Sequence, residues 1–174
     1  MPESIKKNIR NVPDFPKPGI QFKDITPILA DRNLFKHAIH LMANQIQGAP
    51  DIIIGIESRG FIFASALADK LGAGFVPVRK PGKLPYRTFK EEYQLEYGAD
   101  ALEMHTDAIH ENQKVVIIDD LLATGGTALA TMKLVQGTGA KILSVGFLIE
   151  LEFLEGRKKL VENNPENIFS IIKF

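Results

Sequence analysis

The sequence predicts an α/β fold in which a mostly parallel central sheet is flanked by helices. Apolar runs without polar alternation stand at residues 52–56, 115–118 and 142–149, which is typical of strands covered on both faces. Helical patterns separate these runs, and strands that alternate with helices indicate parallel pairing. At 174 residues, residues 1–174 are expected to form a single domain.

Three stretches are expected to be helical. Asp31 is placed to cap a helix that carries apolar residues at four-residue spacing from Leu34 to Ile46. Residues 59–71 are apolar almost all round, as in a helix that crosses over a sheet and is packed on it. A further helix is expected over residues 127–135.

Two regions interrupt this alternation. Residues 79–98 are polar, begin with cations and contain prolines, and so long a stretch without periodicity is either functional or disordered. An irregular loop is therefore expected over about residues 80–98. Residues 12–30 contain three early prolines, which predict an extended segment laid over the domain rather than within its sheet.

The overall composition excludes several classes of protein. Lysine plus arginine and aspartate plus glutamate each total 21, so no global field favours nucleic acid or an acidic membrane surface. The sequence has no cysteine, no signal peptide and no apolar run long enough to cross a bilayer. We therefore expect a soluble cytoplasmic protein without nucleic-acid or membrane partners.

Residues 115–127 read V-V-I-I-D-D-L-L-A-T-G-G-T, an apolar strand followed by two acids and a small-residue turn. Neighbouring strand residues point to opposite faces, so both acids reach solvent if Asp119 and Asp120 lie just beyond the strand's carboxyl end. That edge forms the ligand crevice of open α/β sheets. Carboxylates there suit the cis-diol of a ribose or a hydrated divalent cation.

The turn A-T-G-G-T at 123–127 leads into a helix, and its amides can converge on an anion. Each piece alone is common in plain turns and capped helices. Together they indicate a ribose 5-phosphate, with the diol on the acids and the phosphate on the turn. Neither a G-x-G-x-x-G nor a Walker lysine motif is present, which disfavours a dinucleotide fold.

The stretch 115–127 resembles the signature of the type I phosphoribosyltransferases, which bind 5-phosphoribosyl-1-pyrophosphate (PRPP). Its Leu-Leu-Ala spacing is similar to that of the adenine branch. The resemblance implies the type I phosphoribosyltransferase fold with a small hood region, and ribose hydroxyls bound by Asp119 and Asp120. The residues it assigns to the 5-phosphate are Ala123, Thr124, Gly125, Gly126 and Thr127.

The stretch E-S-R-G-F at 57–61 follows another strand and begins a helix. Arg59 offers a planar, permanently charged fork for phosphate oxygens, or it pairs with Glu57 on the surface. The stretch resembles the family's pyrophosphate loop, which implies a cis peptide between Glu57 and Ser58 and a catalytic role for Arg59.

The irregular region carries further candidates. R-K-P-G-K-L-P and Y-Q-L-E-Y-G resemble the two stems of the family's flexible hood. This similarity implies that Arg79, Lys80 and Lys83 reach the pyrophosphate, although a charge run is also a common solvated face. It also implies that Glu96 and Tyr97 come near the base and sugar, with Glu96 assisting proton movement.

The stretch at 18–29 resembles the small hood segment of the adenine branch, where a phenylalanine covers the purine. Phe22 would take that place, or it anchors the loop in the core. The backbone at Ile20 and Gln21 would read the edge of the base. Lys23 stands where arginine is common, and Leu151 would lie opposite Phe22.

The resemblance implies a pentosyltransferase of purine salvage that joins adenine to PRPP and releases AMP and pyrophosphate. Magnesium would be held mainly through PRPP rather than by protein ligands, and the chain would form a homodimer. Two rival hypotheses remain at this point. One is a phosphoribosyltransferase for hypoxanthine or xanthine, and the other is a regulatory protein that senses PRPP.

Overall fold

The structure is a computed structural model that describes residues 2–94 and 99–174. It divides into two compact units, residues 1–41 and residues 42–174, and each is described by itself. Within the described residues no helix is both long and apolar enough to cross a membrane.

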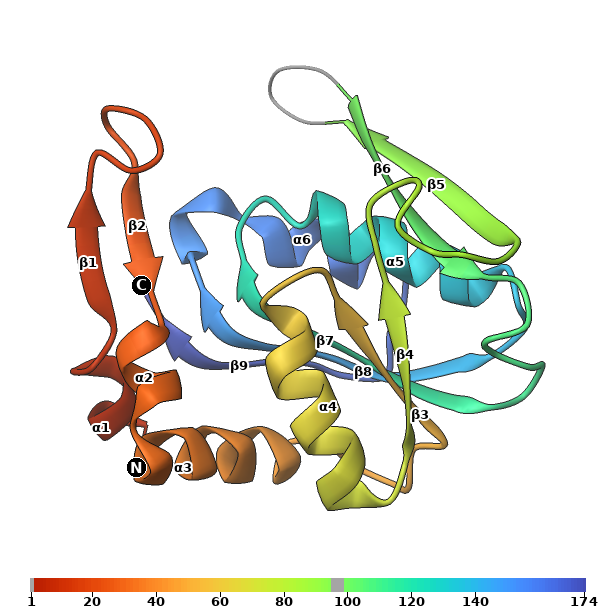
Figure 1. Cartoon of the computed structure of the whole chain (residues 1–174), viewed down its shortest axis with the longest axis horizontal. Helices are drawn as coiled ribbons and strands as arrows, with labels where there is room; N and C mark the ends of the chain where they lie inside the picture. Colours follow the sequence, from red (N-terminus) through yellow and green to blue (C-terminus); the bar gives the residue numbers. More distant parts are fainter. Residues whose placement is uncertain (1, 95–98) are drawn as a thin grey trace. The chain divides into compact units, whose positions relative to one another are not determined.

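A parallel sheet forms the centre of the second unit (Figure 1). Its strand order is β4 (Gly74–Val78), β3 (Ile52–Ile56), β7 (Lys114–Leu122), β8 (Lys141–Glu150) and β9 (Ile168–Lys173). The helices of this unit are α4 (Gly60–Leu71), α5 (Gly126–Gln136) and α6 (Gly156–Val161), with a 3₁₀ turn η1 (Glu152–Leu154). The predicted α/β class and parallel pairing are confirmed.

The order of the strands creates one switch point. From β3 the chain moves outward to β4, whereas from β7 it moves outward in the opposite direction to β8 and β9. The carboxyl ends of β3 and β7 therefore lie side by side, and the chain leaves them in opposite directions. Ligands of open α/β sheets bind at such points, and the segments that begin at Glu57 and Asp119 both lie there.

Both faces of the sheet are covered by apolar side chains. On one face, Ile54 and Ile117 belong to a buried cluster that includes residues of α5 and Leu160 of α6. On the other face, α4 approaches so closely that a Cβ on Gly55 would lie 2.9 Å from the Cβ of Ala64. Burial on both faces explains why the strands read as continuous β-branched runs.

An antiparallel pair of strands, β5 (Thr88–Gln94) and β6 (Ala99–His105), packs on α5. Leu102 and Met104 of β6 are fully buried, and Lys133 of α5 pairs with Glu91 of β5 at 3.2 Å. The prediction of an irregular loop over residues 79–98 is therefore wrong for residues 88–94. Their strand depends on packing against α5, which local periodicity does not report.

The first unit contains α1 (Glu3–Lys6), β1 (Arg10–Pro13), β2 (Gln21–Asp24) and α2 (Thr26–Ala30). The strands form a separate antiparallel pair, which confirms that residues 12–24 lie outside the central sheet. Residues 26–30 were expected to be extended but form a helix, with Pro27 in the first turn where its missing N–H costs nothing.

Helix α3 (Arg32–Ala43) begins as predicted, because Asp31 Oδ1 accepts hydrogen bonds from the amides of Asn33 at 2.8 Å and Leu34 at 3.0 Å. It ends at Ala43, so Ile46 lies beyond the expected helix. The amide of Ile46 instead donates to the carbonyl of Ala43 at 3.2 Å, in a turn.

Candidate active site

Strand β7 carries the two acids inside the sheet. Asp119 and Asp120 were expected just beyond the strand's end, but β7 runs to Leu122, so that prediction is wrong. Pairing with β3 stops at Ile118, whereas pairing with β8 continues through Asp119 to Leu122. Asp119 and Asp120 therefore lie beyond the last residue of β7 that pairs with β3, next to the turn that follows β3.

The two carboxyl groups are placed where charge is unfavourable. The pKa of Asp119 is raised well above its usual value, chiefly by burial and secondly by the charge of the neighbouring Asp120. Burial also raises the pKa of Asp120, although Arg59 opposes this shift. Arg59 Nε lies 2.8 Å from Asp120 Oδ2, so Arg59 pairs with Asp120 rather than with Glu57. This contact joins the turn after β3 to the acids of β7.

The small-residue turn after β7 surrounds a cavity of about 70 Å³. Its lining consists of Asp119, Leu121, Leu122, Ala123, Thr124, Gly125, Gly126, Thr127, Ala128 and Phe147. Helix α5 begins at Gly126, so the cavity lies at a helix N-terminus where amides point outward. The predicted phosphate residues 123–127 are thus brought together with Asp119.

Gly125 explains why this turn needs glycine. Its φ is +80°, and a Cβ at this position would lie 2.6 Å from the carbonyl oxygen of Gly156. A Cβ on Gly156 would in turn lie 2.8 Å from the amide nitrogen of Gly125. The two backbones therefore touch without side chains between them.

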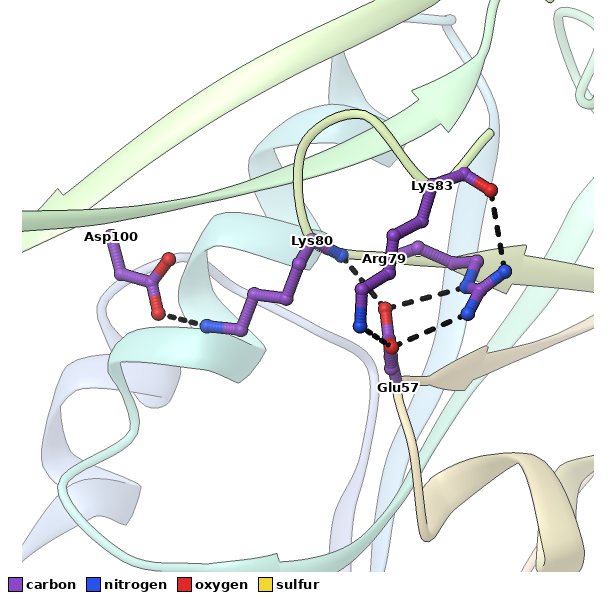
Figure 2. A network of polar contacts seen from close by, with 5 residues as sticks. All are labelled: Glu57, Arg79, Lys80, Lys83 and Asp100. Carbon is purple, nitrogen blue, oxygen red and sulfur yellow. Dashed lines mark hydrogen bonds and ion pairs between the residues drawn. The ribbon is translucent and has the colours of Figure 1, made fainter. Parts of the chain in front are cut away.

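Glu57 is the centre of the cationic region, as Figure 2 shows. Its carboxylate accepts hydrogen bonds from Arg79 Nε and Nη2, both at 3.3 Å, from the Lys80 amide at 3.0 Å and from Lys83 Nζ at 2.5 Å. Burial would raise the pKa of Glu57, but the hydrogen bonds from Lys83, Lys80 and Arg79 lower it to about 2. Arg79 and Lys83 are thus paired with one carboxylate.

Lys80 has a separate partner. Its Nζ contacts the carboxylate of Asp100 of β6 (Figure 2). The same Nζ donates a hydrogen bond to the hydroxyl oxygen of Tyr93 of β5 at 2.9 Å. Burial would lower the pKa of Lys80, but the hydrogen bond to Asp100 raises it. The predicted pyrophosphate cations therefore form a cluster in which carboxylates hold each side chain.

The peptide between Glu57 and Ser58 is cis, as the resemblance implied. Arg59 follows it as the residue before α4. Glu96 and Tyr97 lie outside the described residues, so their predicted roles stay predictions.

The candidate base-binding residues of the first unit lie on and before β2. Phe22 stacks edge-on against Phe15, with ring centroids 5.1 Å apart, and Ile20 is exposed. The side chains of Gln21 and Lys23 both bond to Asn11, at 2.6 and 3.3 Å. In the second unit, the Leu151 amide donates to the Leu122 carbonyl at 2.9 Å. The expected proximity of Phe22 and Leu151 stays a prediction.

Known proteins resemble the chain over almost its full length. Residues 24–173 match the family described as phosphoribosyl transferase domain. The adenine phosphoribosyltransferase of Thermoanaerobacter pseudethanolicus is 56% identical over 173 residues, covering 99% of this chain and 98% of that protein. The chain belongs to the adenine phosphoribosyltransferase family.

Solved structures of this family agree with the fold. A crystal structure of adenine phosphoribosyltransferase from Thermoanaerobacter pseudethanolicus has a TM-score of 0.95 at 55% identity, and covers 100% of both chains. The Saccharomyces cerevisiae enzyme, complexed with an imino-altritol bisphosphate and adenine, has a TM-score of 0.90 at 42% identity, and covers 98% of this chain and 97% of that one. The resemblance seen in residues 115–127 is therefore confirmed.

Some residues around the site were not singled out from the sequence. Asp100 and Tyr93 hold Lys80, and the pair of Glu150 and Arg157 lies next to Gly156. Glu57 was considered as a partner of Arg59, and its actual partners follow 22 to 26 positions later in the chain. The E-S-R-G-F stretch indicates that Glu57 lies at the site. Its partners could not be predicted from that stretch, because they depend on the parallel pairing of β3 with β4.

Proposed function

We propose that the chain transfers the phosphoribosyl group of PRPP to adenine, giving AMP and pyrophosphate in purine salvage. The observation that carries this function is the cavity of residues 123–127 beside the acids of β7 at the switch point of the sheet. Membership of the adenine phosphoribosyltransferase family supports adenine as the base. The residues that line the cavity suit a ribose 5-phosphate.

The 5-phosphate is assigned to the turn 123–127, whose amides and helix N-terminus suit an anion. The ribose hydroxyls are assigned to Asp119 and Asp120. Both carboxyl groups have a raised pKa, so charge on them is unfavourable before a ligand arrives. Two hydroxyl donors would lower that cost, because a carboxylate is stabilised by hydrogen bonds that it accepts.

Pyrophosphate is assigned to Arg59, Arg79, Lys80 and Lys83. In the reaction the bond from the anomeric carbon to the pyrophosphate oxygen breaks, and a bond to a ring nitrogen of adenine forms. Positive charge grows on the sugar while negative charge collects on the departing group. Cations fixed beside that group stabilise the transition state, and exclusion of water protects the sugar cation from hydrolysis.

Tyr97 is assigned to PRPP, and Glu96 to the proton that the adenine ring nitrogen loses. The segment that carries them, together with residues 80–87 before β5, would act as a flexible loop that closes over PRPP. Cleavage by a protease within residues 82–95 should slow when PRPP and magnesium are added. Unchanged cleavage would contradict closure of this loop.

Adenine is assigned to the hood segment over about residues 12–30. Phe22 would cover the purine face opposite Leu151, since aromatic and apolar surfaces suit a stacked base. The backbone at Ile20 and Gln21, together with Lys23, would bond to its edge. We expect Phe22→Ala to raise the KM for adenine more than the KM for PRPP.

Magnesium is proposed as the cofactor. Within the described residues no group of three or more histidine or acidic side chains could form a metal cage. Asp119 and Asp120 offer oxygens of the kind that magnesium prefers, but two carboxylates suit an ion that arrives with its ligand. The ion would be held chiefly by PRPP oxygens, and when bound it would neutralise charge on the departing pyrophosphate.

A homodimer is proposed from the surface of α4 and β4. β4 is an edge strand, and Phe75 on it and Ile62 on α4 are each 37% exposed. Phe75 also stacks edge-on against Phe61, at 5.7 Å between ring centroids. We expect Phe75→Lys to lower the mass measured by sedimentation.

A cytoplasmic location is proposed because the sequence has no cysteine.

Release of pyrophosphate tests the function directly. The full chain is supplied with PRPP, magnesium and adenine, hypoxanthine, guanine or xanthine in turn. Release with adenine alone is the expected result. Equal release with hypoxanthine or xanthine would instead indicate another purine substrate, and binding of PRPP without release with any purine would favour a regulatory protein.

A further inference from the structure

A partly buried ion pair lies next to the turn of residues 123–127 and is not explained by the assignments above. Glu150 ends β8 with its side chain 5% exposed, and Arg157 stands in α6. Arg157 Nε donates to Glu150 Oε1 at 2.9 Å, and Nη2 donates to Oε2 at 2.5 Å. This two-point geometry fixes the guanidinium in one orientation.

The same pair is anchored to β9. Arg157 Nη1 donates to the carbonyl of Ile168 at 2.9 Å, and Nη2 donates to the Ser170 hydroxyl at 3.1 Å. The Ser170 hydroxyl in turn donates to Glu150 Oε2 at 2.6 Å. Burial would raise the pKa of Glu150, but the hydrogen bond from Arg157 lowers it. Arg157 is therefore tied to two strands of the central sheet.

Gly156 connects this anchor to the phosphate turn. It is the chain neighbour of Arg157, and its backbone lies against the backbone of Ala123, Thr124 and Gly125. Their backbones are so close that a Cβ on either Gly125 or Gly156 would overlap the other segment. A displacement of Arg157 would therefore change the contact between Gly156 and the turn.

We propose that Glu150 and Arg157 are positioning residues for the 5-phosphate of PRPP. Their ion pair holds Gly156 against the back of residues 123–125, and Gly156 keeps the amides of the turn at the spacing that one phosphate requires. The inference rests on the proposed function, because it concerns the site assigned to the 5-phosphate. Neither side chain needs to touch the ligand.

The test compares two ligands that occupy different parts of the site. Calorimetry measures the Kd of ribose 5-phosphate and the Kd of pyrophosphate with magnesium, for the full chain and for Arg157→Gln. A turn displaced by a fraction of an ångström should raise the Kd of ribose 5-phosphate about 10- to 100-fold. The Kd of pyrophosphate should change less than about twofold, because its cations lie on other elements.

Three further variants separate positioning from loss of stability. Glu150→Gln keeps the size of the side chain and should act in the same direction as Arg157→Gln, while Arg157→Lys keeps the charge without the two-point contact and should fall between. Ile142→Val is the matched control, since Ile142 is buried at the opposite end of β8. It should lower the melting temperature and leave both Kd values unchanged.

Amide hydrogen exchange provides a readout that does not depend on affinity. Exchange of residues 124–127 should accelerate in Arg157→Gln, while β3 stays as protected as in the unchanged chain. An equal loss of affinity for both ligands, or unchanged exchange in the turn, would show that the pair serves general stability and would overturn the proposal. An unchanged Kd for ribose 5-phosphate would overturn it as well.

The unchanged chain is measured first, which keeps two kinds of failure apart. If ribose 5-phosphate slows amide exchange at residues 124–127, the phosphate assignment holds and the variants test the positioning role alone. If ribose 5-phosphate binds without affecting these amides, or does not bind, the phosphate assignment fails and the positioning proposal fails with it.

Discussion

The turn at residues 123–127, to which we assign the 5-phosphate, and the cationic cluster around Glu57 both follow adjacent strands, yet they differ in the groups that they would offer to an anion. The turn uses backbone amides, a helix N-terminus and a glycine at φ +80°. The cluster uses Arg79, Lys80 and Lys83, whose side chains are already paired with Glu57 and Asp100.

This difference separates a preformed site from one that must exchange partners. Backbone amides held by the fold lose little entropy when phosphate binds. Side chains that are paired with carboxylates must release them before they bind pyrophosphate, and the release offsets part of the new attraction. We therefore expect the turn to depend on backbone geometry and the cluster to depend on charge.

The largest effect is expected when the backbone of the turn is disturbed. Gly125→Ala places a Cβ 2.6 Å from the Gly156 carbonyl oxygen at a positive φ. We expect kcat/KM for PRPP to fall about 100-fold or more, which is the scale of loss when a catalytic site is misplaced by about 1 Å. Steady-state kinetics at saturating adenine measure this change.

Gly72→Ala is the matched control for that variant. Gly72 has a φ of +68°, but no atom lies within 4 Å of the position that a Cβ would take. It should cost similar backbone strain and leave kcat/KM nearly unchanged. Equal losses in the two variants would mean that strain alone, rather than the turn's contact with Gly156, explains the effect.

A smaller effect is expected when one acid of β7 loses its charge. Asp120→Asn should raise the KM for PRPP about 10-fold, since a hydrogen bond to a charged group contributes about 1.5–3 kcal/mol. Stability should change little, because burial already raises the pKa of Asp120. Kinetics and a denaturant titration measure the two quantities, with the exposed Asp69→Asn as control. An unchanged KM would contradict the ribose assignment.

Glu57→Gln tests the exchange of partners in the cluster. With Arg79 and Lys83 released from a carboxylate, pyrophosphate should bind about 3- to 10-fold more tightly, equal to roughly 1 kcal/mol. Calorimetry measures this, with Glu92→Gln, at an exposed ion pair of β5, as the control. Weaker binding would show instead that Glu57 holds the cations in the binding position.

The stability of the chain should also depend on Glu57 in a defined pH range. The folded state lowers the pKa of Glu57 from 4.5 to about 2. Its contribution, about 1–3 kcal/mol, should be fully present above about pH 4.5 and should be lost as the pH falls towards 2. The difference in unfolding free energy between the unchanged chain and Glu57→Gln should therefore shrink over this range. A constant difference would contradict the lowered pKa.

The smallest effect is expected from salt. Ions screen partly exposed side chains more than amides fixed at a helix N-terminus. Raising the ionic strength from about 0.05 to 0.5 M should weaken binding of pyrophosphate about threefold more than binding of ribose 5-phosphate. Calorimetry at the two ionic strengths measures the ratio, and equal weakening would remove the contrast between the regions.

Much of the turn could be predicted from the sequence, whereas for the cluster only the cations could be predicted and not the carboxylates that hold them. The β-branched run before Asp119 and the small residues after it are contiguous, so local chemistry indicates a strand followed by an anion site. The partners of Glu57 come from residues beyond β4. Their pairing depends on which strands become neighbours, and no local pattern encodes that.

Errors in the sequence predictions have the same physical origin. The acids of β7 lie inside the strand because β8 continues to pair after β3 has ended. Residues 88–94 form a strand because α5 covers one of its faces. The contact between Gly125 and Gly156 joins segments on different elements. In each case tertiary contacts decide a feature for which local propensity is uninformative.

The most direct test of the central assignment is to observe both regions in one experiment. Backbone amide signals of residues 124–127 and side-chain guanidinium signals of Arg79 can be followed by NMR during titration. Ribose 5-phosphate should shift the amide signals and leave the Arg79 signals unchanged, whereas pyrophosphate with magnesium should shift the Arg79 signals and leave the amide signals unchanged. Amides of 124–127 that respond to pyrophosphate but not to ribose 5-phosphate would contradict the central assignment.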